Sequence, residues 1–70
     1  MQMLEVNNMR LWAIKIRYLE SPITGDGKWH THTTKWHENS NDAWEEADIF
    51  ERYHGTNWYE SSSSLIHKEK

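Results

Sequence analysis

The chain has 70 residues, no cysteine and a formal net charge of −3, so it is one small domain without a disulfide or a thiolate zinc site. Leu, Ile, Val and Phe supply only 11 residues, but aromatic residues reach 13% and include five tryptophans, which favours a folded domain with an aromatic core over a disordered chain. No apolar run approaches the roughly 18 residues of a membrane span and no signal-peptide pattern occurs, so we expect a cytoplasmic protein.

The domain boundaries follow from where hydrophobic patterning begins and ends. Residues 1–8 show no sustained period, and we expect a frayed leader there. A single α+β domain is expected over residues 9–67, with a frayed C-terminus at 68–70.

Residues 11–19 predict the first strand, because apolar side chains alternate with Ala13, Lys15 and Arg17. One face of this strand carries Trp12, Ile14, Ile16 and Tyr18. It is the most apolar strand, so we place it at the centre of the sheet. Pro22 and two glycines in residues 21–27 then predict a loose hairpin loop.

Residues 28–37 predict the second strand. By alternation along this strand, Trp29 points to one face of the sheet, whereas His30, His32 and Trp36 point to the other. The two tryptophans therefore point to opposite faces unless a bulge shifts the register.

A helix is predicted from Asp42 to His54, because Asp42 and Glu45 have the spacing of a capping box and Gly55 fits the position after the last turn. Its inner stripe consists of Ala43, Ala47, Phe50 and His54. Residues 39–42, rich in Asn, Ser and Asp, precede it.

Trp58 to Ile66 predict a weaker third strand, since four consecutive serines at its centre are typical of an exposed edge. A hairpin followed by a right-handed crossover gives a three-stranded antiparallel sheet of order 2-1-3. One helix then covers one face and leaves the other uncovered.

The charges are segregated along the chain. Residues 10–36 hold five basic and two acidic side chains, whereas residues 37–60 hold seven acidic side chains and one basic, Arg52. The helix therefore presents an acidic outer face, which is either a solvated surface or a surface for a basic partner. Ile49 falls among these acids, as a residue of a small protein-binding patch would.

The sequence does not favour a metal site, a nucleic-acid interface or a catalytic site. His30 and His32 share a strand face at a metal-ligand spacing, but zinc would need ligands from elsewhere, so we expect neither metal nor cofactor. Lysines interleave with Trp29 and Trp36 as in a single-strand binder, although the chain is acidic and lacks a continuous basic groove. No spacing assembles a catalytic triad or a phosphate loop, so we expect no enzyme.

The organisation of the chain resembles a class of very short bacteriophage proteins that inhibit host machinery. The matching elements are Leu11–Ile16, the cap Asn39–Asp42 and the helix that starts Ala43–Ala47 and ends at Gly55. The resemblance covers Leu11 to Ile66 and lies in the order of the elements. It implies a stoichiometric binder of a host protein, such as RNA polymerase, a restriction or related defence complex, or a CRISPR effector.

We therefore expect a non-enzymatic, phage-encoded inhibitor that binds a host enzyme or anti-phage defence complex in the host cytoplasm. A homodimer is expected too, because the edge strand and the uncovered sheet face invite a second copy. The alternatives are a nucleic-acid-associated module that uses the hairpin Trp and Lys residues, or a small accessory or antitoxin-like subunit. The candidate protein-binding residues are Trp29, His30, His32, Trp36, Glu45, Asp48, Ile49, Glu51 and Arg52.

Overall fold

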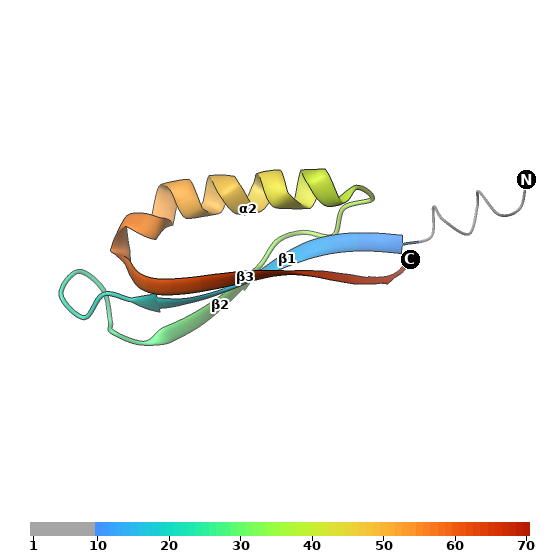
Figure 1. The fold of residues 1–70 in the computed structure, drawn as a ribbon. Helices are drawn as coiled ribbons and strands as arrows, with labels where there is room; N and C mark the ends of the chain where they lie inside the picture. The colour runs from blue at the N-terminus through green and yellow to red at the C-terminus, as the bar shows by residue number, and fades with distance from the viewer. Residues whose placement is uncertain (1–9) are drawn as a thin grey trace, which may run out of the picture.

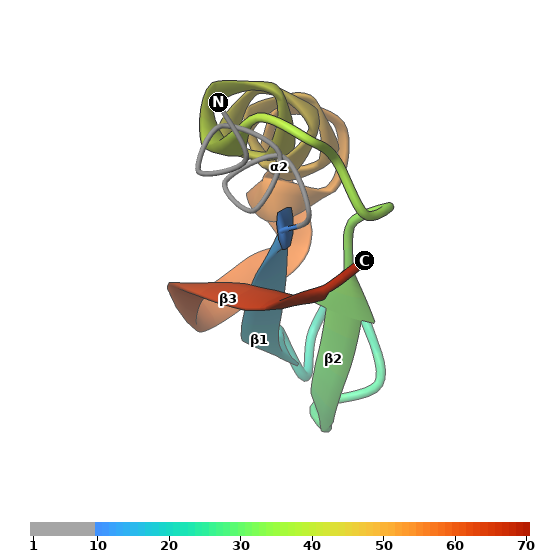
Figure 2. The ribbon, with the colours of Figure 1, turned by 90° about the vertical axis from the view of Figure 1, so that its right-hand side faces the viewer.

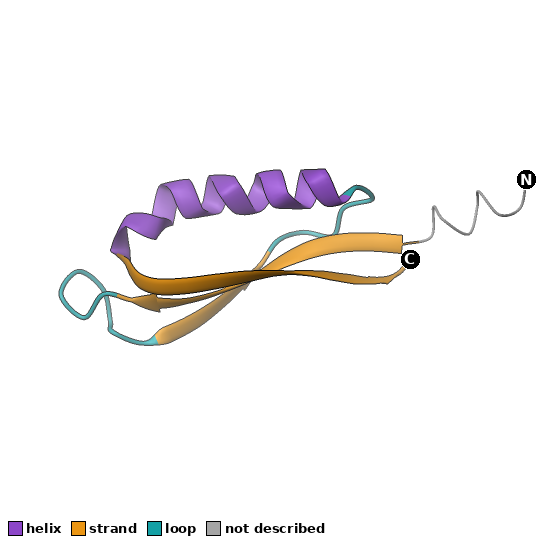
Figure 3. Ribbon diagram, in the orientation of Figure 1, coloured by secondary structure: helices purple, strands orange, loops and turns teal. Residues whose placement is uncertain are grey.

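The computed structural model describes residues 10–70, which form a small α+β domain with one helix on one face of an antiparallel sheet (Figures 1 and 3). The elements are β1 (Arg10–Glu20), β2 (Trp29–Thr33), α2 (Ser40–His54), the short 3₁₀ helix η1 (Gly55–Asn57) and β3 (Trp58–Glu69). The strand order is β2-β1-β3, and β1 pairs antiparallel with both neighbours. The predicted fold class is confirmed. The predicted leader, residues 1–8, lies outside the described residues.

The core lies between β1 and α2. Ile14 and Ile16 are fully buried, and the small side chains of Ala43 and Ala47 let α2 lie close above them. Aromatic side chains pack around this centre rather than filling it: Trp12, Tyr18, Phe50 and Trp58 are partly buried. The expectation of an aromatic core is therefore corrected to an Ile and Ala centre with an aromatic surround, because only small residues fit where α2 approaches β1.

A β-bulge follows β2 and depends on the buried side chain of Thr34. Its Oγ1 accepts the Ile14 N–H at 2.9 Å, a bond that a backbone carbonyl makes in a regular ladder. The Thr34 hydroxyl in turn donates to the Lys35 carbonyl at 3.0 Å. Pairing resumes beyond the bulge, where Trp12 and His37 exchange N–H···O bonds of 2.6 and 2.7 Å.

The bulge changes which face the following residues occupy. Lys15 pairs with Thr33, but Trp12 pairs with His37, so residues 34–36 lie opposite residues 13–14. His37 consequently shares a sheet face with Trp12, on the side of α2. The predicted β2 extends four residues too far, because the ladder ends at Thr33.

α2 ends at His54 as predicted, but its start and the conformation of Gly55 differ from the prediction. The cap is Asn39, whose side chain accepts the Asn41 N–H at 2.7 Å, so the helix starts at Ser40 and the Asp42–Glu45 capping box is wrong. Gly55 has a φ of −66°, which is right-handed, and the chain continues into η1 instead of stopping at a left-handed glycine.

β3 is longer than predicted, because β1 gives it a partner along its whole length. It continues past Ile66 to Glu69, which pairs with Arg10, so Lys68 and Glu69 are part of the sheet rather than frayed. The Lys70 Nζ also lies 2.5 Å from the Glu38 carboxylate. Within residues 10–70, no helix has the length and apolar character that a membrane crossing requires.

Candidate functional site

The outward face of α2 carries four of the predicted binding residues, and a fifth, Glu51, lies at its border. Ala43 and Ala47 fix the inner face, so the helical period turns Glu45, Asp48, Ile49 and Arg52 away from the sheet. Asp48 and Arg52 form an ion pair one turn apart. Glu51 instead leans toward β3, where its carboxylate accepts the Ser63 hydroxyl at 3.1 Å. Ile49 keeps 45% of its surface exposed among these charges.

A shallow, open hollow adjoins this face, between α2 and the bulged segment after β2. It is lined by Lys35, His37, Asp42, Glu45, Glu46 and Ile49. The hollow therefore brings two of the predicted binding residues, Glu45 and Ile49, together with four residues outside that set. We call the outward face of α2 together with this hollow the acidic surface.

An ion pair organises the hollow. The His37 Nε2 lies 2.7 Å from Glu46 Oε1, and the Lys35 N–H donates to the same carboxylate at 3.3 Å. Burial raises the pKa of Glu46, but the hydrogen bonds from His37 and Lys35 and their positive charges outweigh it, so this pKa lies below its ordinary value of 4.5. Glu46 is thus a structural carboxylate that ties α2 to the bulge.

The remaining carboxylates of the hollow are available to a partner. Within residues 10–70, neither Asp42 nor Glu45 lies within ion-pair distance of a basic side chain. They flank the exposed Ile49, and Tyr53 on the same helix is 77% exposed. A Lys or Arg side chain suits such a place, since its aliphatic stem can pack on Ile49 while its charge meets the carboxylates.

The four predicted hairpin residues do not form one patch. His30 and His32 lie on the α2 side of the sheet, where the His32 ring stacks on Phe50 at 3.8 Å and the His30 ring stacks on Tyr18 at 5.3 Å. Trp29 and Trp36 lie on the opposite face, beside Arg17 and Lys68 respectively. The sheet therefore separates the two histidines from the two tryptophans.

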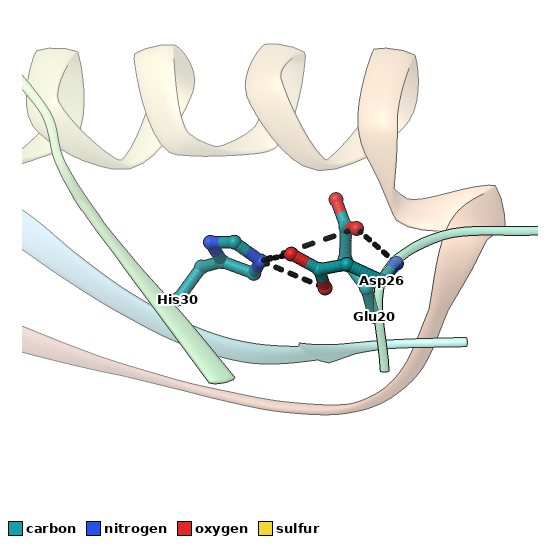
Figure 4. Close-up of side chains that lie close together, drawn as sticks. All are labelled: Glu20, Asp26 and His30. Atoms are coloured by element: carbon teal, nitrogen blue, oxygen red, sulfur yellow. Dashed lines mark hydrogen bonds and ion pairs between the residues drawn. The ribbon is translucent and has the colours of Figure 1, made fainter. Parts of the chain in front are cut away.

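His30 belongs to a cluster at the hairpin loop, drawn in Figure 4 with Glu20 and Asp26. Its Nε2 lies 2.9 Å from Asp26 Oδ2 and 3.9 Å from Glu20 Oε1. The Asp26 N–H donates to Glu20 at 3.0 Å, and Gly25 leaves room for that carboxylate, since a Cβ there would lie 2.5 Å from Glu20 Oε1.

These contacts tie the hairpin loop to the start of β2. The hydrogen bonds from His30 and from the Lys28 N–H lower the pKa of Asp26 and hold its carboxylate ionised. The three groups offer ligand atoms within 4.8 Å of one another, but His32 is not among them. His30 and His32, which the sequence offers as a metal-ligand pair, therefore have different surroundings. His30 contacts the hairpin loop, and His32 stacks on Phe50.

Sequence reasoning missed Lys35, His37 and Glu46 in the hollow. The signal that could have found them is Thr34, a β-branched residue whose hydroxyl can replace a ladder carbonyl and create a bulge. Comparison with protein-family models, with curated proteins and with solved structures finds no match.

Proposed function

We propose that this chain is a non-enzymatic binding protein that inhibits a host enzyme or anti-phage defence complex by stoichiometric docking through the acidic surface. The observation that carries the proposal is the exposed Ile49 beside carboxylates that have no ion-pair partner within the described residues. The matching partner surface is basic, with Lys or Arg side chains that reach into the hollow.

The arrangement has the layout of a small protein interface. Such interfaces combine an apolar centre with a polar rim, and a few central residues dominate the binding energy. Here Ile49 is the centre, while Asp42, Glu45 and the Asp48–Arg52 pair form the rim. Rim carboxylates steer a basic partner and set its orientation more than they add affinity.

Two further features support binding rather than catalysis. The hollow is open and shallow, so it does not exclude water from a reacting group. The order of the elements also resembles the short phage inhibitors, and this resemblance supports phage origin and action in the host cytoplasm.

Affinity capture from a bacterial host lysate tests the proposal when it compares matched variants. The tagged chain is expected to retain a basic protein that Ile49→Arg loses, because the new cation repels the partner at the centre of the acidic surface. Tyr59→Arg, which adds the same charge at an exposed position of β3, is the control and is expected to retain the protein.

Equal retention by both variants would contradict the proposal, as would capture of no protein at all. A captured protein must also bind the purified chain at a fixed ratio, with the same loss in Ile49→Arg. Capture of nucleic acid alone would contradict a protein partner and would instead point to a binding site on the opposite face of the sheet.

We further propose that two copies pair through the free edge of β3. The strand has 12 residues, and no strand of residues 10–70 covers its outer edge (Figure 2). An antiparallel pair about a two-fold axis keeps both helices on one side of a six-stranded sheet. The register with Ser64 on that axis places Glu60 of one copy opposite Lys68 of the other.

A further inference from the structure

One face of the sheet is turned away from α2, and we call it the outer face. No element of residues 10–70 packs over it (Figure 2). Alternation along β1 puts Lys15 and Arg17 on this face, because Ile14 and Ile16 point to α2. Register with β1 adds Trp29 from β2, opposite Leu19, and Lys68 from β3, opposite Leu11.

The bulge places the second tryptophan on the same face. In a regular ladder Trp36 would point toward α2, as His30 and His32 do, whereas here its ring contacts Lys68, whose Nζ lies 4.6 Å from the ring centroid. Trp29 has the same kind of neighbour, since the Arg17 Cζ lies 4.8 Å from its ring centroid. The residues Trp29 and Trp36 remain 46% and 37% exposed.

The outer face is therefore basic, although the whole chain is acidic. Lys15, Arg17 and Lys68 share it with the Glu60 carboxylate, which lies opposite Leu19. The carboxylates of α2 lie beyond the sheet and the helix, more than about 10 Å away, and salt at 0.1 M screens charges over about that distance. A ligand on the outer face thus meets the local positive charge.

We propose that the outer face binds single-stranded nucleic acid, with bases stacked on Trp29 and Trp36 and phosphates near Lys15 and Arg17. Trp29 lies opposite Leu19, and Trp36 lies opposite the Ala13 position. About 20 Å of β1 therefore separates the two tryptophans, and Lys15 and Arg17 lie between them. Proteins that hold a single strand without reading its sequence combine aromatic stacking surfaces with positive charge along the path of the backbone.

Other occupants fit the face less well. A duplex keeps its bases paired and hides the surfaces on which indole rings stack. A second copy packed face to face would oppose three cations with three cations, which is unfavourable. Pairing through β3 leaves the outer face open, so it is compatible with this proposal.

Fluorescence anisotropy with a labelled 12-nucleotide oligothymidylate tests the site. We expect saturable binding to the full chain, and weaker binding to a 12-base-pair duplex. Trp29→Ala and Arg17→Gln should each weaken binding at least about fivefold, because one stacked base or one phosphate contact is lost. Tyr53→Ala, an exposed aromatic residue on α2, is the matched control and should bind as the native chain does.

Salt dependence gives an independent readout. Two phosphate contacts, at Lys15 and Arg17, predict a slope of about −1.4 for log K against log salt, so affinity should fall roughly sevenfold between 50 and 200 mM. Circular dichroism of each variant checks that it is folded, and both substituted side chains are exposed enough to be changed without loss of the core.

No anisotropy change at 20 mM salt would overturn the proposal. The proposal would also be overturned if Trp29→Ala and Arg17→Gln bound the oligonucleotide as tightly as the native chain, or if Tyr53→Ala lost as much affinity as they do. Light scattering that shows a dimer broken by Arg17→Gln would instead assign the outer face to a second copy. None of these results depends on Ile49, so they leave the acidic surface to its own test.

Discussion

Thr34 controls the position of side chains that lie on both faces of the sheet. Its hydroxyl takes the place of a backbone acceptor for Ile14, and the resulting bulge sends Trp36 to the outer face and His37 toward α2. A single hydroxyl thus determines which residues can belong to the acidic surface and which to the outer face.

Removal of the Thr34 hydroxyl should lower the free energy of unfolding by more than the small change in side-chain volume would predict. Thr34→Val keeps the shape but leaves the buried Ile14 N–H without its acceptor, which costs about 1–3 kcal/mol of unfolding free energy. Thr34→Ser keeps the acceptor and should cost less than about 1 kcal/mol, the value of one buried methyl group. Urea unfolding followed by circular dichroism measures both, and equal losses in the two variants would contradict this role.

Glu46 should contribute to stability in a pH-dependent way. Its pKa is lowered in the folded state, so its contribution is complete above the ordinary value of 4.5 and is lost as the pH falls through the folded-state value. Glu46→Gln should lower stability at pH 7 by less than about 1 kcal/mol, since the pair is partly exposed.

The difference between the native chain and Glu46→Gln should therefore shrink on acidification from pH 6 to pH 3. Melting temperatures across that range provide the measurement. Glu45→Gln, which removes a carboxylate from the same hollow without an ion pair to His37, is the control. A difference that grows on acidification would show that Glu46 is not held ionised by His37.

At the scale of single residues, sequence reasoning succeeds only where side-chain direction follows a regular period. The alternation of β1 correctly predicts that Ile14 and Ile16 point to one side. The same parity rule correctly separates Trp29 from His30, but it fails after Thr34 because a bulge depends on a side-chain hydrogen bond across the sheet. The contact between His37 and Glu46 is invisible for the same reason.

At the scale of elements, type and order were easier to predict than boundaries. The helix, the three strands and the strand order are confirmed. The helix start was misplaced because residues 39–42 offer several side chains with the same capping chemistry, and local rules do not choose among them. β3 runs further than its Ser-rich sequence suggests because pairing with β1 overrides intrinsic strand preference.

The start of α2 gives a prediction at this scale. Asn39→Ala should lower the free energy of unfolding by about 1 kcal/mol, because the N–H of Asn41 loses its acceptor. Asp42→Ala, at the position that the capping-box pattern favoured, should cost less, since it only removes a charge near the helix N-terminus. Thermal unfolding of the two variants decides between the two caps, and a larger loss in Asp42→Ala would contradict Asn39 as the cap.

At the scale of the whole molecule, the two broad surfaces carry opposite charge. α2 presents carboxylates around Ile49, while the outer face presents Lys15, Arg17 and Lys68 beside two tryptophans. Segregation of charge along the chain was visible in the sequence, but its separation onto opposite faces follows from the topology. A protein partner and a nucleic acid could then be bound at the same time, on different sides.

The proposed pairing through β3 is tested at this scale by charge exchange. Glu60→Lys should convert a dimer into a monomer in size-exclusion chromatography with light scattering, because it places like charges opposite each other across the two-fold axis. Adding Lys68→Glu to the same chain should restore the dimer. A native chain that is monomeric at micromolar concentration, or a double variant that stays monomeric, would contradict the pairing or its register.

The bulge after β2 also limits how this sequence can change during evolution. Loss of one codon between Thr33 and His37 would exchange the faces of the residues that follow, and with them the partners of Glu46 and Lys68. Substitutions there are less damaging than a change in length. Descendants of this gene should therefore keep the number of residues between those two positions constant, even where the residues themselves have diverged.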